Sequence, residues 1–363
     1  MAIAASGQVD FAQIQTEFGG SNPISLNEYY SGSVGVLGGS VPASGAISVD
    51  NLRGTNAYKG YGFSYFTTPI TCKAFSINFN TEAVAYCSAA QGSGVNPCNV
   101  NSATKGYQMA QQGSSSYGFT FLTEVLETIT STVTAGSSVG GTTSTTNSST
   151  AGYHYFGTSS NNSMPALPNL RTNISKFTFS SQTYSTAAGS TPGVTFATQY
   201  NCQSATKGYV GGTDTWTGDL YNPVDNFSSA LRILSFSSES VTTSGNSLTG
   251  PAGLTSGGNS STTGYFLGRA GAPVVYSSFT TYTLTNSVNF SNDTATDLGV
   301  SITIGSGATF GIVNSRSKLY HCNNNNTSVT YAFNFTNNTR ATVATGTYNA
   351  GSQYAVQSYT INP

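Results

Sequence analysis

Charged side chains are scarce in this sequence. Only 7% of its 363 residues are Asp, Glu, Lys or Arg, against about a quarter in an ordinary soluble protein. The 12 basic and 13 acidic residues nearly cancel, and no basic run occurs. Binding to DNA or RNA depends on clustered Lys and Arg. This composition therefore argues against a nucleic-acid partner.

Long apolar runs and metal-binding clusters are also missing. No stretch approaches the roughly 20 apolar residues that cross a bilayer, so we expect no membrane insertion. The first residues, MAIAASGQ, lack the basic segment and apolar core of a signal peptide. The five Cys residues form no CxxC pair and only two His residues are present, so no metal site is expected.

Paired catalytic groups are equally hard to find. Both histidines follow a repeated Tyr, which favours packing over a Ser-His-Asp triad. Glu124 and Glu127 lie at a repeated turn, which favours a structural role over acid–base chemistry. We expect no catalytic residue and no cofactor. The alternative is a polysaccharide depolymerase that uses Asp214 and Asp219 as its acid pair.

Glycine and aromatic residues are abundant, with 41 Gly, 22 Tyr and 20 Phe. Six related segments, of which SATKGY (204–209) is typical, recur about every 46 to 56 residues and end at Tyr61, Tyr107, Tyr153, Tyr209, Tyr265 and Tyr320. Behind each Tyr comes an alternating aromatic strand that stops at a polar turn, such as Phe119-x-Phe121-Leu-Thr-Glu124. Alternation buries one face of a strand, and the turn leads into the next strand.

Each repeat is therefore expected to be an antiparallel sheet of about four short strands. Such sheets can surround a channel or stack linearly, and units of about 40 to 50 residues favour the ring. The sequence predicts a mainly β protein, a six-bladed β-propeller over residues 55–363. The expected repeats are about 55–98, 99–146, 147–201, 202–258, 259–313 and 314–363.

The Lys/Thr-Gly-Tyr step is expected on an inner strand. There Gly permits a close backbone approach, and Tyr packs between neighbouring blades. Four repeat-equivalent lysines favour structural hydrogen bonds, with a basic ring for an anionic glycan as the alternative: Lys59, Lys105, Lys207 and Lys318.

Cys72 and Cys87 flank a predicted hairpin about Asn80 and Thr81. Free cysteines behave as small buried hydrophobes, so two free thiols are the favoured interpretation. A disulfide across the hairpin is the alternative.

Residues 1–54 do not share the repeat and predict a module with two short helices. Asp10 caps a run that carries Phe11, Ile14 and Phe18 and stops at two glycines. Ser25 and Glu28 then form a capping box before Tyr29 and Tyr30.

The segment GQVDFAQIQTEFGGSNPISLNEYYSG, followed by VPASGAISVDNLRG, resembles the N-terminal module of many tailed-bacteriophage virion proteins, tail fibres and appendages in particular. The resemblance implies that residues 1–54 attach the chain to other virion proteins, and the candidate anchor residues are Phe11, Ile14, Phe18, Tyr29 and Tyr30. The repeats resemble kelch-like propellers through the paired glycines and Trp216 of GYVGGTDTW (208–216).

The longest connections, residues 154–175, 210–230 and 266–285, are rich in polar residues and form the candidate recognition surface. Candidate host-contact residues are Asp214, Trp216, Asp219, Tyr221 and Arg269. We expect a non-enzymatic virion protein, a tail fibre or appendage whose propeller contacts a host glycan or protein. A head or tail decoration that packs only against virion proteins is the alternative, and a homo-oligomer is left open.

Overall fold

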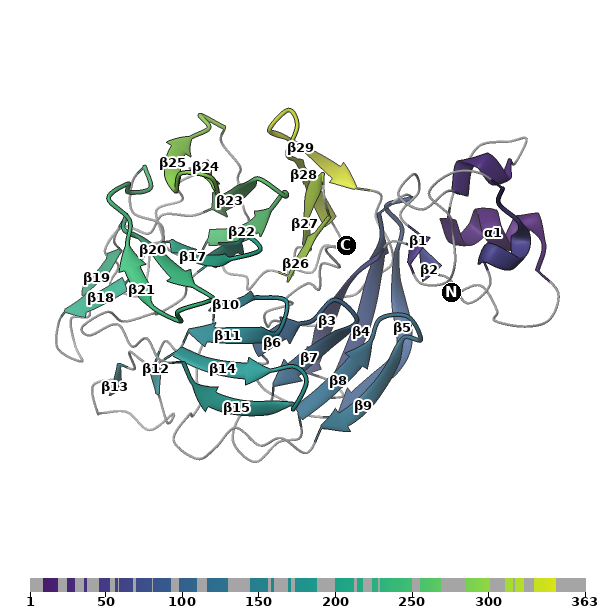
Figure 1. Ribbon diagram of the computed structural model, residues 1–363, viewed down its shortest axis with the longest axis horizontal. Coiled ribbons are helices and arrows are strands. Elements are labelled where there is room, and N and C mark those ends of the chain that lie inside the picture. The colour runs from purple at the N-terminus through teal and green to yellow at the C-terminus, as the bar shows by residue number, and fades with distance from the viewer. Residues whose placement is uncertain are drawn as a thin grey trace.

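The chain forms a six-bladed β-propeller with a small N-terminal module beside it, as the computed structural model shows (Figure 1). The predicted fold class is confirmed for the propeller. The structure describes residues 9–18, 25–29, 36–37, 46–52, 56–57, 59–67, 70–79, 81–92, 98–109, 116–129, 144–155, 158–159, 169–170, 174–187, 200–211, 214–217, 224–227, 229–249, 255–268, 285–300, 311–315, 317–322 and 330–343.

Each blade is an antiparallel sheet whose strands follow one another in chain order. The first three blades are blade 1 with β3 (Lys59–Thr67), β4 (Ile70–Asn78) and β5 (Val84–Gly92); blade 2 with β6 (Cys98–Asn101), β7 (Lys105–Met109), β8 (Ser116–Thr120) and β9 (Val125–Ile129); and blade 3 with β10 (Ser144–Asn147), β11 (Ala151–Tyr155), β14 (Ile174–Thr178) and β15 (Thr183–Thr186).

The remaining three blades repeat this order. They are blade 4 with β16 (Tyr200–Gln203), β17 (Lys207–Gly211), β20 (Leu231–Ser235) and β21 (Val241–Thr243); blade 5 with β22 (Thr255–Asn259), β23 (Thr263–Gly268), β24 (Thr285–Asn289) and β25 (Thr294–Asp297); and blade 6 with β26 (Gly311–Asn314), β27 (Lys318–Cys322), β28 (Thr330–Asn334) and β29 (Thr339–Val343).

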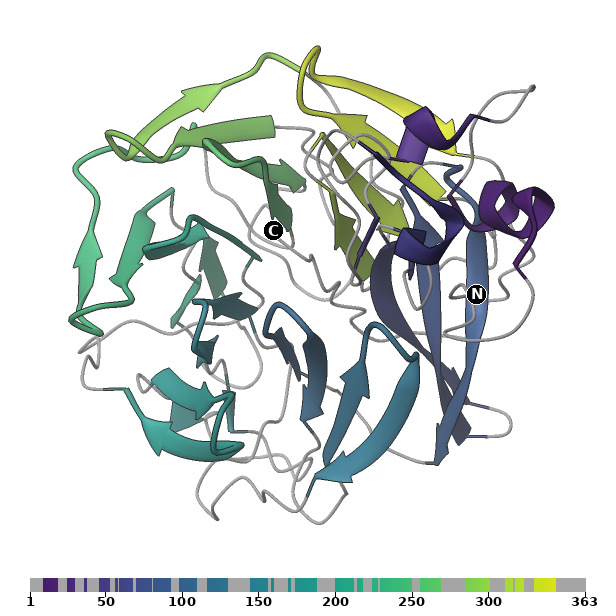
Figure 2. The same ribbon diagram turned by 45° about the vertical axis from the view of Figure 1, so that its right-hand side comes forward.

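The first strands of neighbouring blades contact one another around the centre, and β26 contacts β3 to complete the ring (Figure 2). Within the described residues, blade 1 has three strands and each of the others has four.

A Tyr ring lies flat against a Phe ring at every blade interface. The ring centroids are 4.5 to 5.4 Å apart and the interplanar angles are 5 to 19°. The six pairs are Tyr61–Phe121, Tyr107–Phe179, Tyr153–Phe236, Tyr209–Phe290, Tyr265–Phe335 and Tyr320–Phe79. The last pair joins blade 6 to blade 1. The prediction that the repeated Tyr packs between blades is confirmed.

In blades 2 to 6 the stacked Phe is held in place by the turn between the first two strands of its own blade. The backbone N–H of Phe290 donates to the Thr262 carbonyl at 3.0 Å, and four other blades make the same bond. The turn itself is fixed by its Ser. In blade 4 the Ser204 hydroxyl accepts from the Lys207 N–H at 3.0 Å. Equivalent bonds come from Ser102, Ser148, Ser260 and Ser315.

Glycine in the second strand lets a side chain of the preceding blade pack directly on backbone. A Cβ atom at Gly152 would lie 2.3 Å from the Val100 Cβ, and one at Gly264 would lie 2.1 Å from the Cys202 sulfur. Such distances exclude any side chain there without movement. The expected role of this Gly, a close backbone approach on an inner strand, is confirmed.

The interface between blades 5 and 6 reverses this arrangement. Leu319 stands where the other second strands carry Gly, and Gly258 stands where the other first strands carry a side chain. A Cβ atom at Gly258 would lie 2.1 Å from the Leu319 side chain, which is fully buried. The same space is therefore filled from the opposite side.

In the described residues of the N-terminal module there is one α-helix, α1 (Phe11–Phe18), where the sequence predicted two short helices. Asp10 caps it as expected, because the Gln13 N–H donates to the Asp10 carboxylate at 2.8 Å. The predicted second helix is a single 3₁₀ turn, η1 (Leu26–Tyr29). A helix nucleus fixes three residues for its first hydrogen bond, so a segment of 4 residues gains too few hydrogen bonds to form a full α-helix. A second such turn is η2 (Val49–Leu52), and β1 (Val36–Leu37) pairs with β2 (Asn56–Ala57).

The hairpin predicted about Asn80 and Thr81 joins β4 to β5, but its cysteines do not face each other. Cys72 lies opposite Gln91 in the register, and a bulge between Lys73 and Phe75 shifts the pairing that follows. Cys87 is a buried free thiol whose pKa is raised to about 12 by burial. The disulfide alternative is therefore wrong, and the thiol interpretation of Cys87 is confirmed.

The reversed packing predicts that substitutions at Gly258 and Leu319 compensate each other in stability. Leu319→Gly should lower the free energy of unfolding by about 2–5 kcal/mol, the range for large-to-small core changes, and Gly258→Val alone should lower it by overpacking. The double variant should regain part of both losses because it recreates the arrangement of the other interfaces. Urea unfolding of the four proteins measures the coupling, and strictly additive losses would contradict the account.

Candidate functional site

The propeller has two faces of different character. The turns between first and second strands and the hairpins between third and fourth strands lie on one face, here named the turn face. The connections between second and third strands lie on the opposite face, named the loop face. The backbone bonds from the stacked Phe residues to the Ser turns hold the turn face together.

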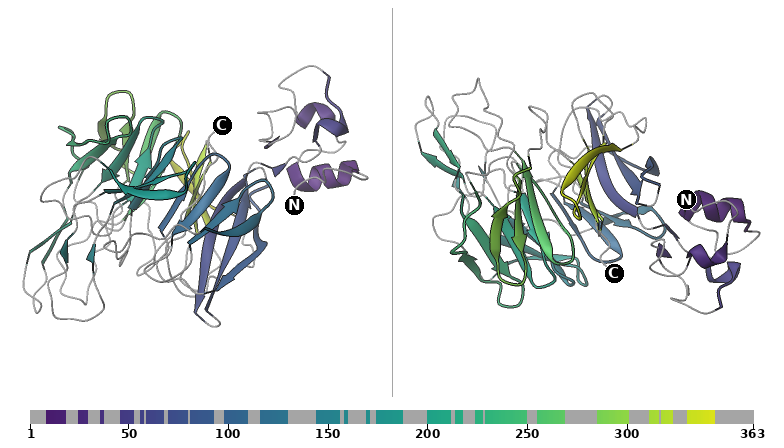
Figure 3. Two further views of the ribbon diagram at one scale, coloured as in Figure 1. Left: turned by 60° about the horizontal axis from the view of Figure 1, so that its bottom comes forward. Right: turned by 90° about the horizontal axis from the view of Figure 1, so that it is seen from above.

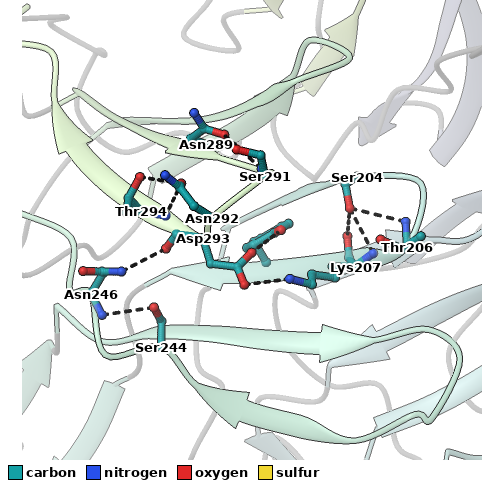
Figure 4. Close-up of polar contacts among 11 residues, drawn as sticks. Ser204, Thr206, Lys207, Ser244, Asn246, Asn289, Ser291, Asn292, Asp293 and Thr294 are labelled. Carbon is teal, nitrogen blue, oxygen red and sulfur yellow. Dashed lines mark hydrogen bonds and ion pairs between the residues drawn. The ribbon is translucent and has the colours of Figure 1, made fainter.

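Ion pairs link neighbouring blades on the turn face. Between blades 4 and 5, the Lys207 Nζ lies 2.6 Å from an Asp293 oxygen, and the Tyr209 hydroxyl donates to the other oxygen at 2.7 Å (Figure 4). Three more interfaces carry a pair of this kind, namely Lys59–Glu124, Lys176–Glu239 and Lys318–Glu82. Four of the six interfaces are therefore bridged by opposite charges.

The residue at this turn position has a left-handed backbone in all six blades. These residues are also all the described non-glycine residues with positive φ, at 52 to 57°: Glu82, Glu124, Gln182, Glu239, Asp293 and Asn338. This conformation costs about 1–2 kcal/mol for a residue with a Cβ. Contacts with the preceding blade offset that cost where the side chain is a carboxylate.

At each interface, a Lys of the preceding blade faces the turn residue only where that residue is a carboxylate. Blade 3 has Ala151 at the usual Lys position, and Lys176 on the neighbouring strand replaces it as the partner of Glu239. Where the turn residue is the neutral Gln182, Lys105 pairs with Glu127 of its own blade instead. Where it is Asn338, the Lys position holds a Thr.

The repeated tyrosines act as protonated donors. Burial, followed by the carboxylate of Glu239, raises the pKa of Tyr153 to about 12. Burial and the Asp293 carboxylate likewise raise the pKa of Tyr209. Three of the repeat-equivalent lysines are paired with turn acids and Lys105 is paired with Glu127, as the structural interpretation of the lysines predicted.

Amide contacts at three of the blade interfaces were missed by sequence reasoning. The Asn101 N–H donates to Asn147 Oδ1 at 2.9 Å, and the Asn147 N–H donates to Gln203 Oε1 at 2.5 Å. Asn259 and Asn314 are linked in the same way at 3.0 Å. Each amide residue directly precedes the Ser of the repeated turn, so the signal was present in the repeat.

His154 packs in the interior, as its repeat position predicted. Its side chain is fully buried, and burial lowers its pKa to about 3. The Tyr184 hydroxyl lies 3.5 Å from its Nε2. The neutral imidazole therefore belongs to the core of blade 3, where β14 and β15 cover it.

The three connections named as the candidate recognition surface join the second to the third strand in blades 3, 4 and 5, and the strand ends that they join lie on the loop face. Within two of them are short ribbons, β12 (Thr158–Ser159) with β13 (Asn169–Leu170), and β18 (Asp214–Thr217) with β19 (Val224–Phe227). Trp216 lies opposite Asp225 in the second ribbon. The structure thus brings Asp214 and Trp216 onto one strand. Asp219, Tyr221 and Arg269 lie outside the described residues.

The candidate anchor residues differ in exposure. Ile14 and Tyr29 are fully buried, so they shape the module from within, whereas Phe11 is 46% exposed. The side chain of Phe18 and all of Tyr30 lie outside the described part of the chain. Leu52, from η2, is also fully buried.

No protein-family model and no curated protein sequence matches this chain. Among the described helices, none has the length and apolar character to cross a membrane. In the same parts of the chain, no three His, Cys, Asp or Glu side chains gather where a metal ion could bind.

Because Asp293 is paired with Lys207, replacing Asp by Asn should lower the stability more at position 293 than at position 297 of the same blade. Asp293→Asn keeps a residue that tolerates the left-handed turn but removes the charge that Lys207 faces, so the free energy of unfolding should fall by about 1–3 kcal/mol. Asp297→Asn makes the same change on an exposed strand of the same blade and should shift stability by less than about 0.5 kcal/mol. Equal effects in urea unfolding would argue against the interface pair.

Proposed function

We propose that this protein is a non-enzymatic structural component of a bacteriophage virion. In this proposal it is a tail fibre or appendage: residues 1–54 bind other virion proteins, and the propeller contacts a glycan or protein on the host surface. The protein is made in the host cytoplasm and resides in the virion.

The proposal's attachment half is supported by the sequence of the N-terminal module. Its order of elements resembles that of phage virion proteins over about 50 residues. The module lies beside the ring rather than within it (Figure 1), and α1 contacts β2 at the entrance to blade 1. A part that stands apart from the propeller core is suited to joining another protein.

The proposal rests mainly on one observation: the N-terminal module and the ribbons of the long connections lie at opposite ends of the molecule. The chain enters β3 from the turn face, because β3 occupies the second-strand position of blade 1. The long connections leave from the loop face. In both views of Figure 3, the ribbons β12–β13 and β18–β19 lie at the end of the molecule away from the N-terminal module. Attachment at one end leaves the other end free for contact.

The closed ring supports display of those connections. Binding residues are often carried by variable loops on a rigid scaffold, and every interface here is fixed by a stacked aromatic pair. The turn-face charges are engaged in ion pairs with one another. Recognition is therefore assigned to the loop face, with Trp216 as the residue to test first.

The proposal predicts that attachment and recognition can be separated. A chain of residues 55–363 should fold, bind host cells saturably and with the same affinity as the full chain, and fail to join phage particles. Cell binding of the labelled proteins and immunoblots of purified particles measure the two properties. Normal incorporation of the shortened chain would contradict the attachment role.

Two substitutions locate the contact. Trp216→Ala should weaken cell binding severalfold, whereas Val125→Ala, which trims an exposed apolar residue on the turn face, should not. Absence of binding by every protein, even when clustered on beads to supply multivalency, would favour a decoration protein instead. Breakdown of host polysaccharide by the pure protein would favour the depolymerase alternative with Asp214 and Asp219.

A further inference from the structure

Arg232 is a basic side chain whose charge is not balanced within the described part of the chain. It lies on β20, the third strand of blade 4, and its Nη1 donates to the hydroxyl of Thr243 on the outer strand. No described carboxylate lies within ion-pair distance of it, and its Nε is buried without a hydrogen-bond partner. Burial lowers the pKa of Arg232, yet a guanidinium stays protonated in proteins.

The other basic residues whose side chains are described have partners. Arg340 lies over the ring of Tyr331, with its guanidinium carbon 3.5 Å from the ring centroid. Five lysines each form an ion pair with a Glu or Asp, namely Lys59, Lys105, Lys176, Lys207 and Lys318. A charge that is partly removed from water without a counter-charge costs stability. Such exceptions are expected at functional sites, so Arg232 is a candidate for binding a group outside the chain.

Arg232 stands at the end of blade 4 from which the recognition connections leave. β20 begins at the loop face, directly after the connection 210–230 that carries the ribbon β18–β19. The register partner of Arg232 on the second strand is Val210, which packs in one cluster with Ile174 of blade 3. Residues directly opposite in antiparallel strands share a face of the sheet. Arg232 is therefore on the face of blade 4 that is turned toward blade 3.

The guanidinium of Arg232 is held in place yet open to a ligand at its tip. The side chain is half-buried, and its hydrogen bond to Thr243 lies at the surface, where Thr243 is exposed. This bond orients the planar group from one side. The described residues leave the other N–H groups of the terminal nitrogens unengaged. Two parallel N–H groups of a guanidinium match the oxygens of a carboxylate or a phosphate.

We propose that Arg232 binds an anionic oxygen group, a carboxylate or a phosphate, of a glycan on the host surface. The inference rests on the proposed function and adds that its ligand is negatively charged. The lysines that could have formed a basic ring are engaged with acids, so they do not compete for this role. The connection that precedes β20 also contains Trp216. An aromatic residue and an unbalanced cation thus belong to one candidate surface, and Arg is frequent among residues that dominate binding.

Binding of the full-length protein to host cells tests the proposal. Arg232→Gln should weaken binding about tenfold or more, because hydrogen bonds to charged groups contribute that much, and should reduce the dependence of binding on NaCl. Arg340→Gln is the matched control, since it removes the same charge from the turn-face end of blade 6. Unchanged binding by Arg232→Gln, or equal weakening in the two variants, would overturn the proposal.

A competition experiment identifies the anionic group. Surface polysaccharide purified from the host is used in three forms: unmodified, with its carboxylates reduced to alcohols, and with its phosphates removed. The unmodified form should compete with cells for the protein. Loss of competition after carboxylate reduction would assign a carboxylate, and loss after phosphate removal would assign a phosphate. Competition by all three forms, or by none, would overturn the proposal.

Urea unfolding separates ligand binding from a structural role. Arg232→Gln removes a charge that has no ionic partner in the described chain, so its urea midpoint should equal or exceed that of the unaltered protein. A lower midpoint together with unchanged cell binding would assign Arg232 to the fold and overturn the proposal. Failure of the unaltered protein to bind cells would contradict the proposed function itself, and the role of Arg232 would fall with it.

Discussion

The contact on which this structure depends is the stack of a Tyr ring on a Phe ring of the next blade. It occurs at all six interfaces, including the one between the last blade and the first. Offset-stacked aromatic pairs contribute about 0.5–1.5 kcal/mol beyond their buried area. The Gly beside five of the six Tyr residues and the turn bonded to five of the six Phe residues serve to bring the two rings together. The period of the repeat follows from this requirement.

The few charged residues of this chain also serve the blade interfaces. Five lysines and five acids form pairs at or beside the blade interfaces, in a chain that has 12 basic and 13 acidic residues. The pairs differ in detail, yet a carboxylate at the turn always has a Lys partner, and a neutral turn residue has none. Lys176 shows this most clearly, because it supplies from β14 the charge that Ala151 does not. These ion pairs constrain the residues of the turn face, so sequence variation is left to the loop face.

Much of this could be predicted from the sequence because the repeat encodes it. The Tyr and Phe landmarks predicted the blades and the packing of Tyr between them, and the glycine of SATKGY predicted the close approach. Features that depend on register could not be predicted: the pairing of β4 with β5 places Cys72 opposite Gln91 and away from Cys87, and Lys176 reaches Glu239 only through strand pairing. The reversed placement of Gly258 and Leu319 occurs at one interface alone, so the repeat pattern could not predict it. At the candidate site, the pattern placed the three long connections but not their side chains.

The most direct measurement compares the same substitution at the closing interface and at an internal one. Phe79 lies between blades 6 and 1, and Phe179 lies between blades 2 and 3, each stacked on a Tyr. If the ring is closed by equivalent contacts, Phe79→Leu and Phe179→Leu should each lower the free energy of unfolding by about 1 kcal/mol in a single cooperative urea transition. Loss of stability in Phe179→Leu with none in Phe79→Leu would show that the ring is open and would contradict the account.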